Sequence, residues 1–122
     1  MYRRIVFNVL AMNCDDHVKN ISFLMNRDGE WSLSPAYGVT FTYNPNGRTC
    51  AHQMSVNGKW DKITKNDLLA CAESYGVKNS EAMNILLAVR DAVAGWRDYA
   101  EEASLSEAAA NKIEMYLSEM NI

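Results

Sequence analysis

The sequence predicts a mainly α-helical domain with one small β-hairpin. In four segments, apolar residues recur every three or four positions, which is the spacing of one helix face. Two short apolar runs flank the turn residues Asp28 and Gly29, as in a hairpin. With 122 residues, 48% of them hydrophobic, the chain fits a single domain with its own core.

The first expected element is a buried helix over residues 2–12. Its apolar positions share one broad face: Ile5, Val6, Val9, Leu10 and Met12. Arg3 and Arg4 ahead of this run resemble the start of a signal peptide. However, Asn8 interrupts the apolar core, and acidic residues at 15–16 stand where a cleavage site requires small side chains. We therefore expect a helix of the mature protein.

The hairpin is expected next, with strands over residues 21–25 and 30–34 joined by the turn at 26–29. Asp28 and Gly29 tolerate the backbone angles that such a turn requires. Pro35 stops the second strand because it has no amide hydrogen for pairing. A core position is expected for Trp31. Residues 39–63 are rich in turn signals, so loops are expected there, with a short extended piece near 53–56.

Three helices should follow. Thr64 and Asp67 form a capping-box-like start of the first, and Gly76 is a plausible end. Ser80 is the expected N-cap of the longest helix. Its apolar stripe runs through the interrupting Gly95: Ala82, Ile85, Leu86, Val89, Val93, Trp96 and Ala100. Ser106 is expected to cap the last helix, which carries Ala109, Ile113, Tyr116, Leu117 and Met120 inward.

Composition narrows the class of function. The net charge of −3 argues against a dedicated nucleic-acid binder, which usually has a basic face. No apolar run approaches the ~20 residues of a membrane span. The three cysteines are widely spaced, with no Cys-x-x-Cys pair, so neither a disulfide framework nor a zinc site is indicated. We expect reduced cysteines and a cytoplasmic protein without a membrane partner.

A polar cluster over residues 13–20, just before the hairpin, is the best candidate for chemistry. Asp15 and Asn20 have the Asp-x-x-x-x-Asn spacing of the protein-kinase catalytic loop. In that loop the carboxylate accepts the proton of the substrate hydroxyl and the amide oxygen binds magnesium, while Lys19 is placed to meet phosphate charge. The pattern alone is equally typical of a loop in which Asp15 or Asp16 caps a turn and Asn20 satisfies backbone groups.

Several motifs together resemble one family. They are Asn13-Cys14-Asp15-Asp16-His17-Val18-Lys19-Asn20-Ile21-Ser22-Phe23-Leu24, Trp31-Ser32-Leu33-Ser34-Pro35-Ala36-Tyr37, Met54-Ser55-Val56-Asn57-Gly58-Lys59 and Ile63-Thr64. They resemble the HipA family, bacterial serine/threonine kinases that act as toxins in toxin–antitoxin pairs. The resemblance implies a kinase C-lobe-like fold, ATP, magnesium, a protein substrate and a DNA-binding antitoxin as partner.

The resemblance also implies residue roles. Asp15 matches the catalytic base and Asn20 the metal-ligating asparagine. His17 and Lys19 match positions of the same loop, as candidates for nucleotide or phosphate binding. For His17 the alternative is a structural role in holding the carbonyls or carboxylates of the loop. For Lys19 a phosphate contact and a solvated charge remain equally open.

Two departures from the family pattern argue against activity. Gly38 stands where the family has a magnesium-holding aspartate, and the chain contains no glycine-rich phosphate loop. We therefore expect residues 1–122 to be a single HipA-like C-terminal domain without the N-terminal kinase lobe, inactive alone. Three explanations stay open: the chain is a piece of a longer protein, it is a natural remnant that uses this lobe for something else, or the N-terminal lobe is a separate chain.

The alternative function is a non-catalytic module of a toxin–antitoxin system. Such a module would bind an antitoxin or a kinase homologue, or form a homo-oligomer, through an exposed apolar face. The candidates for this face are Trp60, Trp31 and Phe41, although a core role is favoured for Trp31. A decayed fragment that folds and does nothing is a third reading.

Overall fold

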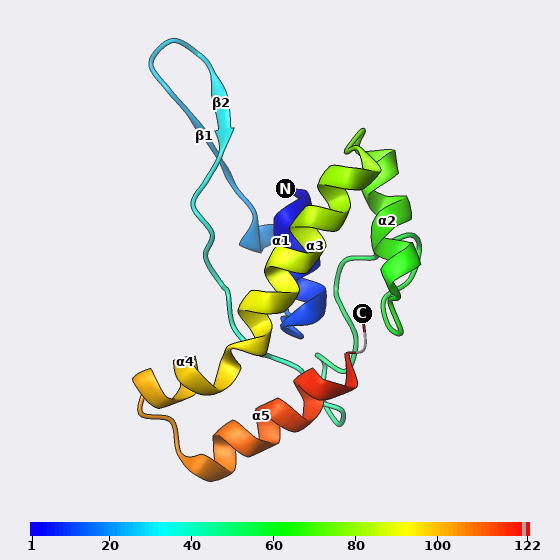
Figure 1. Ribbon diagram of the computed structural model, residues 1–122. Helices are drawn as coiled ribbons and strands as arrows, with labels where there is room; N and C mark the ends of the chain where they lie inside the picture. The colour runs from blue at the N-terminus through cyan, green and yellow to red at the C-terminus, as the bar shows by residue number, and fades with distance from the viewer. Residues whose placement is uncertain (121) are drawn as a thin grey trace.

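The computed structural model describes residues 1–120 and 122, and the expected fold class is confirmed. Within these residues the elements are α1 (Tyr2–Leu10), a short 3-10 helix (Val18–Asn20), β1 (Phe23–Met25), β2 (Trp31–Leu33), α2 (Lys65–Ser74), α3 (Asn79–Ala94), α4 (Trp96–Glu102) and α5 (Glu107–Glu119). The helices form one body, and the two strands extend away from it (Figure 1).

The core lies where α1 and α2 pack against α3. Its fully buried residues come from all three helices, as the three-four spacing predicted: Val6 and Val9 from α1, Leu68 from α2, and Ala82 and Leu86 from α3. Val56 and Ile63 from the irregular middle segment complete this core. Helix α1 ends at Leu10, two residues before the expected boundary.

The start and end of α2 are held by local hydrogen bonds. The Asp67 backbone N–H donates to Thr64 Oγ1 (3.3 Å), and the Thr64 N–H donates to Asp67 Oδ2 (2.9 Å), so the capping box is confirmed. At the other end Gly76 adopts φ +71°, and the Val77 N–H donates to Ala72 O at 2.9 Å. This is a Schellman ending, in which glycine occupies the left-handed position.

Asp67 also anchors the preceding loop. The side chains of Asn57 and Lys59 each donate to its carboxylate at 2.9 Å, and both residues belong to a tight turn closed by the Val56–Lys59 bridge. The hydrogen bonds from Thr64, Lys59 and Asn57 keep the pKa of Asp67 well below its ordinary value. The family-like stretch at 54–59 therefore fixes the middle segment to the start of α2.

The long expected helix is wrong in two respects. Helix α3 begins at Asn79 with Lys78 as its N-cap, so Ser80 lies inside the first turn. The helix also ends at Ala94, and Gly95 separates it from α4. Trp96 consequently belongs to α4, where its indole Nε1 donates to Ala110 O of α5 at 3.2 Å. The Ser106 cap of α5 is confirmed by its bond from the Ala109 N–H.

The hairpin pairs Phe23 with Leu33 and Met25 with Trp31 in antiparallel register. The turn is closed by Asn26, whose Oδ1 accepts the N–H groups of Asp28 and Glu30 at 2.9 Å. The expected core position of Trp31 is wrong, because its side chain is 69% exposed. Neither face of the strands is covered by a helix, so the strand pattern is present without a packing partner (Figure 1).

Candidate functional site

The loop at residues 11–20 begins where α1 ends. Met12 adopts φ +51°, and the Asn13 N–H donates to Asn8 O at 2.9 Å, which turns the chain out of the helix. Buried and exposed side chains then alternate: Cys14 and Asp16 point inward, whereas Asp15 lies at the surface. The end of α1 thus presents Asp15 to solvent from a loop that is anchored on both sides.

Asp15 and Asn20, the two residues singled out by spacing, are brought together. Asn20 Nδ2 donates to the backbone O of Asp15 at 2.8 Å, and the Asp15 N–H donates to Thr42 Oγ1 at 3.0 Å. One Asn20 donor therefore satisfies the loop backbone, while its Oδ1 has no protein partner in the described part of the chain. An amide oxygen free in this way is a suitable ligand for a hard cation.

Gly38 lies directly against Asn20. A Cβ atom added to Gly38 would stand 3.1 Å from Asn20 Cγ and 3.3 Å from its Oδ1. Two hydrogen bonds hold the segment that contains Tyr37 and Gly38 against the loop. Asn13 Nδ2 donates to Gly38 O, and the Tyr37 hydroxyl donates to Lys19 O, both at 2.9 Å. Position 38 is therefore adjacent to the amide of Asn20, although glycine brings no side chain to it.

His17 and Lys19 line the same open groove as Asp15. His17 Nε2 is 3.8 Å from Asp15 Oδ1, an ion-pair distance when the imidazole is protonated, and both side chains are partly exposed. Lys19 is exposed and lines an open groove of about 740 Å³ together with Asp15, Arg48 and Thr49. The two alternatives for each of these residues remain open.

A buried ion pair under the loop was not anticipated. Asp16 Oδ2 meets His52 Nδ1 at 2.9 Å, and both side chains are at most 7% exposed. Asp16 Oδ1 accepts the N–H groups of Gln53 (2.7 Å) and Met54 (3.4 Å), while His52 Nε2 lies 4.0 Å from Cys14 Sγ. The carboxylate beside Asp15 thus attaches the loop to a segment 36 residues away.

The electrostatics of this pair favour the charged forms. Burial by itself lowers the pKa of His52, but the hydrogen bonds with Asp16 and Cys14 outweigh it and raise the pKa to about 9. Burial likewise raises the pKa of Asp16, yet the hydrogen bonds from His52, Gln53 and Met54 lower it overall. His52 is the second of only two histidines, which was the single sequence signal that could have drawn attention to it.

The residues present do not make a magnesium site by themselves. Magnesium prefers oxygen ligands, usually with at least one carboxylate. The Asn20 amide oxygen is available here, but position 38 has no carboxylate. Within residues 1–120 and 122, no three His, Cys, Asp or Glu side chains are grouped so that they could hold a metal ion.

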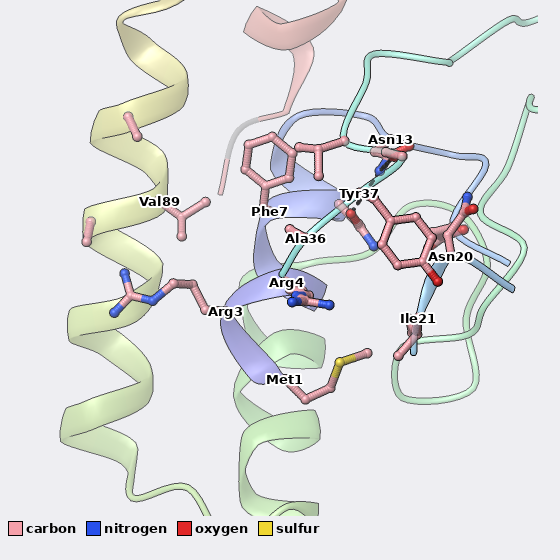
Figure 2. Close-up of a pocket in the computed structure, with 16 residues that line it drawn as sticks. Met1, Arg3, Arg4, Phe7, Asn13, Asn20, Ile21, Ala36, Tyr37 and Val89 are labelled. Atoms are coloured by element: carbon pink, nitrogen blue, oxygen red, sulfur yellow. Dashed lines mark hydrogen bonds between the residues drawn. The ribbon is translucent and has the colours of Figure 1, made fainter. Parts of the chain in front are cut away.

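A cavity of about 340 Å³ opens beside Asn20 and Gly38. In Figure 2, Asn13, Tyr37 and Asn20 lie on one side of this cavity, Val89 of α3 lies on the opposite side, and Arg4 of α1 extends between them. Asn13, Tyr37 and Gly38, whose hydrogen bonds hold the loop around Asn20, therefore also line the cavity.

The structure is a helical lobe in which the polar loop at residues 11–20 precedes an antiparallel hairpin. The same loop contacts the segment after the hairpin, at Tyr37 and Gly38. The model of the HipA-like C-terminal domain matches residues 1–96, and the chain belongs to this family. The match includes the loop, the hairpin, Gly38 and helices α1–α3.

No significant match was found among curated proteins or among solved structures. None of the helices described has the length and apolar character needed to cross a membrane.

Proposed function

We propose that this chain is the catalytic-loop lobe of a HipA-like ATP-dependent serine/threonine kinase of a toxin–antitoxin system, and that it is inactive as it stands. The observation that supports this proposal most directly is that Asp15, Asn20 and position 38 lie close together at one loop, and that position 38 is a glycine. In an assembly with a complete metal site, Asp15 would accept the proton of the substrate hydroxyl and Asn20 would offer an amide oxygen to magnesium.

The missing carboxylate accounts for the inactivity. Phosphoryl transfer depends on positioning and on neutralisation of charge by metal, so an incomplete metal site removes a principal contribution. The 122 residues also contain no glycine-rich loop to cover the nucleotide phosphates. Activity therefore requires both a carboxylate at position 38 and phosphate-binding groups from outside these residues.

The test is calorimetric titration with Mg-ATP of the parent chain and of Gly38→Asp. Aspartate is among the residues that best tolerate a left-handed backbone such as φ +63°, and its Cβ would be directed at Asn20. We expect weak affinity in the parent and a gain of about tenfold or more in the variant, which corresponds to ~1.4 kcal/mol. Titration without magnesium should abolish this gain.

Gly29→Asp is the matched control. Gly29 also has a positive φ, +81°, but nothing lies within 4 Å of an added Cβ, so this variant tests backbone strain without creating a ligand. Equal affinity of the parent and Gly38→Asp for Mg-ATP would contradict the proposed role of position 38.

A second candidate function is a non-catalytic interaction module that binds an antitoxin or a kinase homologue. The exposed hairpin favours it, because Phe23, Met25 and Trp31 share one face of the two strands and are each more than half exposed. Light scattering of the chain at increasing concentration, beside Trp31→Ser, measures self-association through this face. A dimer that the substitution abolishes supports the module, and a monomer at every concentration weakens it.

A further inference from the structure

The cavity beside Asn20 holds a cation without an anion. The guanidinium of Arg4 is half-buried; its Nη2 donates to Ser34 O, while Nη1 is buried and lacks a hydrogen-bond partner among the described residues. Asp16 also lines the cavity, but its carboxylate oxygens are engaged by His52, Gln53 and Met54. Because a guanidinium is always charged in proteins, this site is complementary to an anion.

A second polar group in the cavity is unpaired. Asn13 is 3% exposed, and its Nδ2 donates to Asn8 Oδ1 (3.1 Å) and to Gly38 O (2.9 Å). Since both partners are acceptors, the orientation of the amide is fixed. Its Oδ1 is left buried with no partner in the described residues. A buried acceptor in this state costs free energy unless a donor reaches it.

Most of the remaining wall is apolar, although Arg3, Asn8, Asn20 and Tyr37 also line it. Its apolar part includes Phe7 of α1, Ile21 and Val39 of the flanking segments, and Ala88, Val89 and Ala92 of α3. The volume of about 340 Å³ is within the range of small-molecule sites, which combine apolar walls with a few convergent polar groups.

We propose that this cavity binds a small organic acid with an apolar body, whose carboxylate pairs with Arg4 and whose hydroxyl or amino group donates to Asn13 Oδ1. Arg4 Nη1 and Asn13 Oδ1 are both closed off from solvent, so the lining side chains must move apart for the ligand to reach them. The apolar body packs against Phe7 and Val89. The site uses neither magnesium nor the missing carboxylate at position 38, so it goes beyond the kinase proposal. Because Asn13 holds Gly38 O as well, an occupied cavity would stabilise the segment that carries position 38.

Phenyllactate is the probe, since it combines a carboxylate, a hydroxyl and a phenyl ring. Two analogues each remove one group: 2-phenylethanol lacks the carboxylate, and 3-phenylpropionate lacks the hydroxyl. Calorimetry should rank them with phenyllactate tightest, 3-phenylpropionate intermediate and 2-phenylethanol weakest. These titrations use the parent chain without nucleotide or magnesium, so their result does not depend on the kinase proposal. If Gly38→Asp fails to gain affinity for Mg-ATP, the parent chain should still bind phenyllactate.

Arg4→Met retains the aliphatic stem and removes the charge, and it should weaken phenyllactate about tenfold or more. Ala88→Phe fills the cavity from an exposed position of α3, so it should block binding without disturbing the core. It keeps the proposal testable if Arg4→Met does not fold. Arg90→Met, an exposed position on the same helix outside the cavity lining, is the control that should not change affinity. No binding of phenyllactate, equal binding of 2-phenylethanol, or full binding by Ala88→Phe would overturn the proposal.

Discussion

Replacing His52 by leucine tests whether the buried ion pair holds the candidate catalytic loop. The substitution leaves the Asp16 carboxylate buried with only two backbone donors, at Gln53 and Met54. Removing one partner of a buried pair costs ~3–5 kcal/mol. The rise of the His52 pKa from 6.5 to about 9 gives a similar magnitude, about 3 kcal/mol, because each pH unit is worth ~1.4 kcal/mol.

The pH dependence distinguishes an ionic role from a packing role. The folded pKa of His52 lies above its unfolded value, so its contribution is complete below pH 6.5 and is lost as the pH rises through about 9. Asp16, whose folded pKa is lowered, contributes above its ordinary value of 3.8 and loses this contribution as the pH falls through its folded value. The stability difference between wild type and His52→Leu should therefore be largest between pH 4 and 6.5, in the window set by these two groups.

Urea unfolding and thermal unfolding, both followed by circular dichroism, measure this difference at several pH values. At ~4 °C per kcal/mol for a chain of this size, the melting temperature should fall by about 12 °C or more near pH 6.5. Cys71, whose pKa is raised by burial, titrates in both proteins and cancels in the comparison. His17→Leu, at a more exposed histidine with a 3.8 Å pair, should change stability by less than ~1 kcal/mol. A difference that does not shrink toward pH 9 would refute the ionic role.

Three further predictions concern the fold and use the same unfolding assay. Thr64→Ala removes the acceptor of the α2 cap and should cost ~1 kcal/mol, whereas Lys65→Ala next to it should be nearly neutral. Leu86→Ala at a fully buried position of α3 should cost ~2–5 kcal/mol, and a loss below 1 kcal/mol would contradict its place in the core. Trp31→Ser should change stability by less than ~0.5 kcal/mol, since the side chain is 69% exposed; a loss above ~2 kcal/mol would mean that the hairpin is packed.

Features determined by nearby residues were predictable from the sequence. The capping box of α2, its glycine ending and the Ser106 cap each depend on residues within about one turn, and all three were confirmed. The hairpin turn belongs to the same class, because Asn26 and Gly29 settle it locally. Local chemistry is sufficient in these places because no distant residue competes for the same backbone groups.

Apart from the Ser80 cap, which is a local error, the wrong predictions concern features that depend on packing between elements. The pattern around Trp31 correctly indicated a strand, but it carries no information on whether another element covers that strand. The apolar stripe predicts one helix through Gly95, because glycine inside a helix costs only about 1 kcal/mol relative to alanine. Instead, the contacts of Trp96 and Arg97 with α5 set a separate direction for α4. Helix propensity is a weak guide where the free energy of tertiary contacts is larger than the difference in propensity.

The candidate site was only half predictable for the same reason. Asp15 and Asn20 lie on one short loop, so their spacing determined that they meet. The contact of Asp16 with His52 crosses 36 residues of irregular chain, and no periodicity relates the two. Gly38 was identified through resemblance, and its position against the amide of Asn20 could not be read from spacing alone.

The contacts that hold the loop explain why its geometry survives with glycine at position 38. Asn13 and Tyr37 fix the segment around Gly38 through backbone oxygens, and Asp16 fixes the loop from below through His52. None of these bonds involves the side chain at position 38 or a metal ion. A carboxylate at this position would therefore leave these bonds in place, but it would put a non-glycine residue at φ +63° and its Cβ 3.1 Å from Asn20 Cγ, so the Asn20 amide must shift. The unfolding free energy of Gly38→Asp, measured beside that of Gly29→Asp, gives the cost of this strain, and affinities for Mg-ATP are compared under conditions in which both variants are folded.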